Sequence, residues 1–87
     1  MPVDELPPPA VAPHERDLAE VLPADSYKPD AEVWVHLRDM GWLPGAITVT
    51  GLWGVQVRFE LPAGRGTAWD IVMPDRVALR VQQGGQR

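Results

Sequence analysis

The sequence predicts an all-β fold, a small five-stranded barrel, preceded by a Pro-rich acidic arm that we expect to be disordered. Two observations lead to this prediction. Short runs of alternating apolar and polar residues are separated by glycine and proline, as strands are separated by turns. Seven of the ten prolines lie at or before Pro29, and all eight glycines lie at or after Gly41. We therefore expect an arm over residues 1–29, a barrel over 30–82 and a frayed tail over 83–87.

The arm carries most of the acidity of the chain. Residues 1–27 have a formal net charge of −5, whereas residues 28–87 have a charge of +1. The stretch Leu-Pro-Pro-Pro-Ala-Val-Ala-Pro at 6–13 favours polyproline II and excludes a helix or a central strand. Apolar residues within 14–22 follow the spacing of one helix face. Two alternatives remain for this part: a short amphipathic helix that needs a surface to dock on, or a solvated leader that frays, which we favour.

The first two strands are predicted by alternation. Residues 32–38 alternate strictly, a turn follows at 39–41, and a second strand runs over 42–50. Alternate side chains of a strand point to opposite faces, so one set on each strand is expected to face the core. The inward candidates are Val33, Val35, Leu37, Ile47 and Val49.

The remaining elements follow in order along the chain. They are a strand over 55–60 with Val55, Val57 and Phe59 inward, a loop over 62–66, a strand over 67–72, a one-turn 3-10 helix over 74–76 and a last strand over 77–81. Five short strands with Gly and Pro turns favour a small barrel, which leaves few free edges. The single helical turn before the last strand favours an SH3-like barrel over an OB-type barrel, because OB folds carry a longer helix after the third strand.

Four stretches are similar to the strands of a known family. Val-Trp-Val-His at 33–36 looks like its first strand, Gly-Trp-Leu-Pro-Gly-Ala-Ile at 41–47 like its second and Gly-Val-Gln-Val-Arg-Phe at 54–59 like its third. Residues 70–80, Asp-Ile-Val-Met-Pro-Asp-Arg-Val-Ala-Leu-Arg, are similar to its last part. The chain thus resembles the SH3-like barrels of the Tudor, agenet and KOW type over about residues 30–81.

The resemblance implies a fold and a general role in binding a peptide or a nucleic acid. Glu-Leu-Pro at 60–62 stands where Tudor domains often have Asp-Tyr-Gly, and the Ala-Leu-Tyr-Asp-Tyr motif of signalling SH3 domains is missing. A methyl-binding aromatic cage and the recognition of Pro-rich ligands therefore do not carry over from the resemblance.

Four tryptophans are many for so small a domain, and aromatic side chains with a polar handle are typical binding anchors. We predict a non-catalytic interaction module that binds a protein or peptide partner through an exposed aromatic groove. The predicted groove consists of Trp34, His36, Trp42 and Phe59, with Arg58 at its rim. For Trp34 and Trp42 the alternative is that the rings cover the barrel ends or pack under the arm. For Trp53 and Trp69 a packing role is favoured, and burial is expected for Trp69.

Two other functions remain open at this stage. A nucleic-acid-binding accessory protein would use the same aromatic residues together with a stripe of arginines. That stripe consists of Arg38, Arg58, Arg65, Arg76 and Arg80. The small charge of residues 28–87 and the acidic arm argue against it. The other alternative is a homodimer that buries the aromatic face.

The arm suggests a further hypothesis. In this hypothesis the arm folds back over the barrel and masks the aromatic face with Leu18, Val21 and Leu22. Alternatively the arm is itself a ligand for another protein, through its prolines or its short helix.

Catalysis has little support in the sequence. The chain has no cysteine, Ser26 stands alone in the linker, and His14 and His36 have no nucleophile nearby in sequence. We expect no enzyme activity, no cofactor and no metal site. No stretch approaches the length of about 20 apolar residues that crosses a bilayer, so we expect no membrane partner and a cytoplasmic location.

Overall fold

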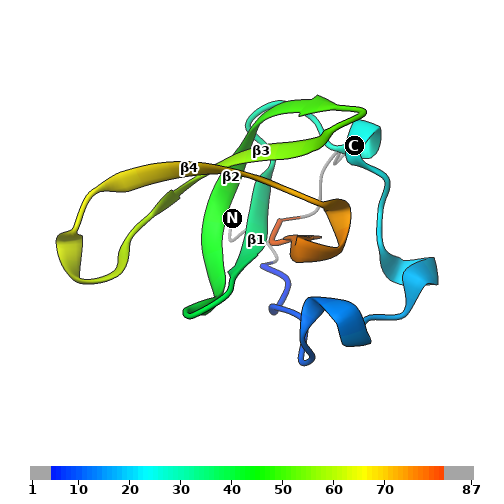
Figure 1. The fold of residues 1–87 in the computed structure, drawn as a ribbon, viewed down its shortest axis with the longest axis horizontal. Helices are drawn as coiled ribbons and strands as arrows, with labels where there is room; N and C mark the ends of the chain where they lie inside the picture. The colour runs from blue at the N-terminus through cyan, green and yellow to red at the C-terminus, as the bar shows by residue number, and fades with distance from the viewer. Residues whose placement is uncertain (1–4, 82–87) are drawn as a thin grey trace.

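A computed structural model of the chain describes residues 5–81. Its main feature is one five-stranded antiparallel sheet with the strand order β4-β3-β2-β1-β5 (Figure 1). The strands are β1 (Glu32–Leu37), β2 (Gly41–Gly51), β3 (Gly54–Glu60), β4 (Thr67–Val72) and β5 (Val77–Leu79). The predicted all-β class is confirmed, and each predicted strand lies within two residues of an observed one. Closure of the sheet into a barrel stays a prediction.

Single turns of 3-10 helix connect and precede the strands. They are η1 (Pro13–Glu15), η2 (Leu18–Glu20), η3 (Ala24–Ser26), η4 (Pro62–Gly64) and η5 (Pro74–Arg76). The turn η5 directly before β5 is the helical turn that the sequence predicts at 74–76. The long β3–β4 hairpin projects away from the rest of the sheet, and η4 lies at its far end (Figure 1).

The core lies on one face of the sheet, which we call the inner face. It consists of Tyr27, Val33, Val35, Ile47, Val55, Val57, Phe59, Val72 and Val77, all buried. Alternation places the valines of β1 and β3 on this face, as predicted. In β2, Gly45 stands opposite Val33 and Phe59, and a Cβ at Gly45 would come within 3.3 Å of the Phe59 Cβ. The missing side chain at Gly45 therefore lets β3 pack closely onto β2.

Two inward predictions for the first strands need correction or refinement. Val49 was expected in the core but is 48% exposed. A bulge between Ile47 and Val49 shifts the β2–β3 register by one residue, so the alternation of β2 changes face at this point. Leu37 at the end of β1 is only partly buried, although it packs against the core.

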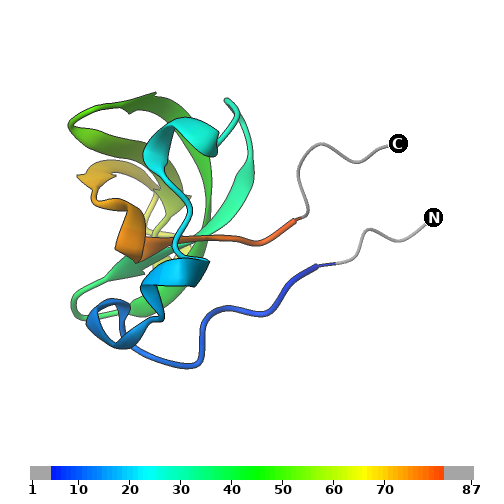
Figure 2. The same cartoon turned by 90° about the vertical axis from the view of Figure 1, so that its right-hand side faces the viewer.

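The disorder expected for the arm is not confirmed over its described part. Residues 5–29 run along the sheet and its helical turns, and Tyr27 belongs to the core although it precedes the expected boundary at residue 30. Figure 2 shows the first described residues of the arm beside the last described residues of the chain. A bridge between Glu5 and Val81 joins these two ends of the described chain.

The single helix considered over residues 14–22 is replaced by η1 and η2. The break falls at Arg16 and Asp17, whose backbones are extended. The Arg16 side chain reaches to η5, and the Asp17 carboxylate accepts a hydrogen bond from the Ala19 amide at 3.0 Å, which starts the new turn. Local capping and one long-range contact thus outweigh a helix that is too short to be stable by itself.

The tail expected to fray over residues 83–87 lies outside the described residues. Within residues 5–81, no helix has the length and the apolar character needed to cross a membrane.

Candidate functional site

Three aromatic side chains of the predicted groove share the face of the sheet opposite the core, which we call the outer face. In the β1–β2 register, Trp34 stands opposite Pro44 and His36 opposite Trp42. Because neighbours across a ladder point to the same side, all four side chains lie on the outer face. The His36 and Trp42 rings meet edge to face, with centroids 5.1 Å apart and planes at 71°. We call the set Trp34, His36 and Trp42 the aromatic face.

The arm lies on the aromatic face. The Trp34 indole Nε1–H donates a hydrogen bond to the Leu6 carbonyl at 2.9 Å, and the Trp42 Nε1–H donates one to the Val11 carbonyl at 3.1 Å. Both acceptors are backbone oxygens, so any extended segment with a carbonyl at the right place could occupy these positions. Each indole thus packs its apolar ring on the sheet and donates its N–H to the backbone of the arm.

An arginine stacks on each of the two indole rings. The Arg16 guanidinium carbon lies 5.7 Å from the centroid of Trp42, and that of Arg80 lies 5.8 Å from the centroid of Trp34. Arg16 Nη1 also donates to the carbonyls of Asp75 and Val77, both at 2.8 Å. Arg16, which comes from the arm, therefore fastens the arm to η5 and β5.

The other end of the arm is fastened to the end of β5. The Leu6 amide donates to the Arg80 carbonyl at 2.8 Å. The Arg80 guanidinium pairs with Glu5 at 3.1 Å and with Glu32 of β1 at 2.9 Å. Both carboxylates are more than half exposed, so these ion pairs add little stability and act mainly to orient the groups.

Between its two attachments the arm is extended and matches polyproline II only in part. Ala12 has φ −68° and ψ 159°, close to the ideal values for that helix. Leu6, Pro9 and Ala12 are partly buried, whereas Pro7, Pro8, Ala10 and Val11 are exposed. The three-residue spacing of Leu6 and Pro9 matches polyproline II, but the chain bends at Ala10 and Val11, and Pro13 is partly buried as well. The arm is therefore an extended segment with a bend and not one continuous polyproline II helix.

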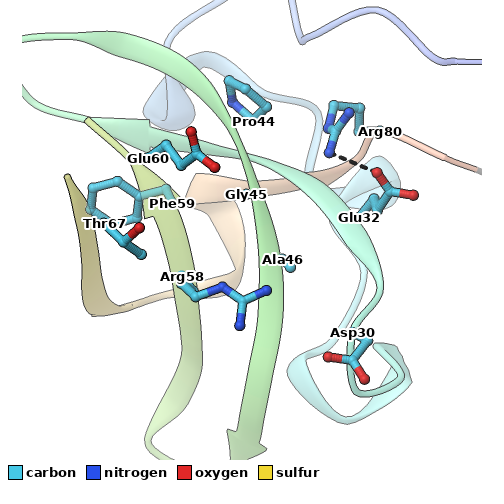
Figure 3. A pocket seen from close by; sticks show the side chains of 10 residues that line it. All are labelled: Asp30, Glu32, Pro44, Gly45, Ala46, Arg58, Phe59, Glu60, Thr67 and Arg80. Atoms are coloured by element: carbon cyan, nitrogen blue, oxygen red, sulfur yellow. Dashed lines mark hydrogen bonds and ion pairs between the residues drawn. The ribbon is translucent and has the colours of Figure 1, made fainter. Parts of the chain in front are cut away.

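A hollow of about 560 Å³ lies beside the aromatic face, over the middle of β2. Pro44, Gly45 and Ala46 form its floor, because their small side chains leave space between the larger residues of β1 and β3 (Figure 3). Acidic and basic groups surround it, and the Arg58 side chain extends from β3 across β2 (Figure 3). The charged residues are Asp30, Glu32, Arg58, Glu60 and Arg80.

The structure thus divides the predicted groove. Trp34, His36 and Trp42 come together, but they are partly covered by the arm and not freely exposed. Arg58 lies on the outer face of β3 and lines the hollow. Phe59 is 5% exposed and packs in the core, because alternation along β3 turns it to the inner face.

Three arm residues that complete the site were not predicted from the sequence: Leu6, Val11 and Arg16. The only signal for them was the polyproline II preference of the segment before Arg16. The hypothesis that the arm masks the aromatic face named different residues. Leu18 is 82% exposed and Leu22 packs against the core. The arm residues that contact the aromatic face are instead Leu6, Val11 and Arg16.

Burial of Trp69 is not observed. Trp69 is 60% exposed on β4, because β4 is the outermost strand of the described sheet and its outer face has no cover. Trp53 in the turn between β2 and β3 is 50% exposed. The sequence placed Trp69 and Ile71 on one face correctly, but which face is buried depends on the neighbouring elements.

The five arginines of the alternative prediction do not form one stripe. They occupy the β1–β2 turn (Arg38), β3 (Arg58), the β3–β4 loop (Arg65), η5 (Arg76) and the end of β5 (Arg80). Arg80 is committed to two carboxylates, as described above. The projecting hairpin separates the loop position from the strands near the arm (Figure 1).

The electrostatics of the aromatic face favour a neutral imidazole. Burial lowers the pKa of His36 below its ordinary value near 6.5, and the charge of Arg76 lowers it further. His36 is therefore neutral at neutral pH and packs against Trp42 as an uncharged ring. Within residues 5–81, no group of three acidic, histidine or cysteine side chains is arranged to hold a metal ion.

Comparison of this chain with protein-family models, with curated proteins and with solved structures finds no match.

Proposed function

We propose that this chain is a non-catalytic interaction module that binds an extended peptide segment of a partner protein on its aromatic face. One observation carries the proposal: the two indole N–H groups of Trp34 and Trp42 donate to backbone carbonyls of an extended segment, at 2.9 and 3.1 Å. Backbone hydrogen bonds supply affinity for a peptide of many sequences, and the rings supply apolar contact area.

We further propose that the sheet curves into an SH3-like barrel of the Tudor, agenet and KOW type. The antiparallel order β4-β3-β2-β1-β5 supports this proposal, as does the 3-10 turn between β4 and β5. Such a barrel presents one strand pair as a binding surface while its interior remains filled by side chains.

Binding of nucleic acid has weaker support. Single-stranded nucleic acid needs aromatic platforms in a positively charged groove. The hollow beside the aromatic face instead has three carboxylates against two guanidinium groups among its lining residues. We therefore treat nucleic acid as the outcome that would replace the proposal.

The proposal is tested by affinity capture from a lysate of the source organism, with and without nuclease. The bait is the full chain, compared with Trp42→Ala and with Trp53→Ala as a matched control outside the aromatic face. We expect a protein that is retained after nuclease treatment, lost with Trp42→Ala and kept with Trp53→Ala. Cross-linking and mass spectrometry should then place the bound segment of that protein on β1 and β2.

Two outcomes would overturn the proposal. Capture that disappears after nuclease treatment would favour a nucleic-acid-binding protein and direct attention to Arg58 and Arg65. Capture that is equal for Trp42→Ala and the wild type would place the binding surface elsewhere on the molecule.

A further inference from the structure

We propose that the partner of the aromatic face is an extended Pro-rich segment, and that the chain's own residues 6–13 occupy the site as a tethered competitor. This inference rests on the proposed function and adds the chemical class of the partner and the device that regulates access to it. The arm itself, seated on the aromatic face, is the observation that identifies the occupant.

The contacts of the arm are those that an extended Pro-rich ligand offers. A Pro-rich segment forms neither a helix nor a strand ladder, so its carbonyls are free to accept from outside. The two carbonyls that the indoles use, those of Leu6 and Val11, are five residues apart. The chain bends at Ala10 and Val11. A partner therefore needs an extended Pro-rich backbone with a bend that brings two of its carbonyls to the two indoles.

The arm is held by contacts that can open without unfolding the sheet. None of residues 5–20 is fully buried, and η1 and η2 contain no buried residue. The strongest single attachment is Arg16, with two hydrogen bonds to carbonyls and its guanidinium over Trp42. Farther along the chain, Tyr27 lies in the core, so residues 5–16 can leave while the rest of the linker stays in place.

Tethering makes the arm an effective competitor even if its intrinsic affinity is weak. A segment joined by a short linker has an effective concentration on the order of millimolar at its own site. A free peptide must displace the arm. The apparent affinity of the peptide is therefore its intrinsic affinity multiplied by the fraction of molecules whose arm is open. Weakening the arm without touching the aromatic face should therefore increase the apparent affinity for a free peptide.

The test uses the full chain and a fluorescein-labelled peptide with the sequence of residues 5–13, followed by fluorescence anisotropy. The arm is weakened by Pro7→Gly/Pro8→Ser/Pro9→Gly, which removes the polyproline II preference and leaves the aromatic face intact. The matched control is Pro62→Gly, in the β3–β4 loop. A control peptide carries Gly-Ser-Gly in place of the three prolines. Urea unfolding of each variant confirms that the sheet is folded.

We expect the arm-weakened variant to bind the proline peptide at least about tenfold more tightly than either the wild type or Pro62→Gly. The control peptide should bind at least about tenfold more weakly than the proline peptide. Adding Trp34→Phe and Trp42→Phe to the arm-weakened variant keeps an aromatic ring at each position but removes both N–H donors. This addition should reduce the affinity about tenfold or more, since each hydrogen bond contributes about 1 kcal/mol.

Other results overturn the inference in distinguishable ways. Equal affinity for the wild type and the arm-weakened variant would show that the arm does not compete. No binding of the proline peptide to the arm-weakened variant, together with a captured protein that depends on Trp42, would show that the partner is not Pro-rich while the proposed function stands. No peptide binding and no Trp42-dependent capture would end both proposals.

Discussion

Trp34 and Trp42 contribute to the fold and, in the function that we propose, also to a binding site. Each ring lies on the outer face of the sheet, and each N–H needs an acceptor that a sheet with fully paired inner strands does not offer. The carbonyls of Leu6 and Val11 meet this need because an extended Pro-rich segment leaves its own carbonyls unpaired. In the proposed function, the same two indole donors bind the carbonyls of a segment from another chain in the same way.

Tyr27 connects the linker to the core through its ring and its hydroxyl. The hydroxyl donates to the Val77 carbonyl at 3.3 Å, but that carbonyl also accepts from Arg16 at 2.8 Å. Tyr27→Phe should therefore cost no more than about 1 kcal/mol in the free energy of unfolding, because the carbonyl keeps a partner. Tyr27→Ala should cost about 3–5 kcal/mol, because it leaves a cavity in the core. Urea unfolding at fixed pH measures both, and similar losses for the two variants would contradict this division.

His36 should make stability depend on pH in one direction. Its pKa in the folded state is lower than its ordinary value near 6.5, so the unfolded chain binds the proton more readily. The contribution of His36 is complete above about pH 6.5 and is lost as the pH falls below that value. NMR titration of the ring should give a midpoint below 6.5. His36→Gln should flatten the decrease in stability toward acid pH, and His14→Gln in the arm serves as the control; a midpoint above 6.5 would contradict the prediction.

At the scale of the elements, alternation predicted the strands because one face of each is buried in the core. Ile47 and Phe59 were placed inward for this reason, and both are buried. Alternation failed at Val49, where a bulge that has no clear sequence signature changes the register. It also failed for Trp69, because a pattern shows which residues share a face but not whether a neighbouring element covers that face.

The exposed edge of β4 shows a feature that protects it from pairing with another chain. The Asp70 carboxylate accepts a hydrogen bond from the Ile71 amide at 2.8 Å, so a donor on the outermost described strand is already occupied. A charge on an edge strand also disfavours the approach of another strand. Trp69 and Ile71 beside it are apolar and more than half exposed.

Replacing Asp70 should therefore promote association through β4. We expect Asp70→Thr to form dimers or larger species at concentrations at least about tenfold lower than Asp39→Thr, a matched change in the β1–β2 turn. Sedimentation velocity at several concentrations measures this difference. If the two variants sediment alike at every concentration, the carboxylate does not protect the edge.

At the scale of the whole molecule, the sequence predicted the parts of the site but not their assembly. Trp34, His36 and Trp42 were found because a strand pair in register brings them together. The sequence suggested the arm as their cover but named the wrong arm residues, because docking of the arm depends on two indole donors and on Arg16, which contacts residues about 60 positions away. A Pro-rich segment has no alternation or helical spacing that reveals a docked state.

The molecule should accordingly open in two stages, the arm before the sheet. The Leu6 amide donates to the Arg80 carbonyl and the Asp30 amide to the Ile47 carbonyl, both at 2.8 Å, so the two bonds are matched in length. Undocking of the arm releases no fully buried residue of 5–20, whereas loss of the second bond disturbs the core around Ile47. Hydrogen exchange followed by NMR should show the Leu6 amide exchanging at least about tenfold faster than the Asp30 amide, after correction for intrinsic rates. Equal protection of the two amides would mean that the arm leaves only when the whole chain unfolds. A free Pro-rich segment could then reach the aromatic face no faster than global unfolding allows, and the arm would be a fixed part of the fold.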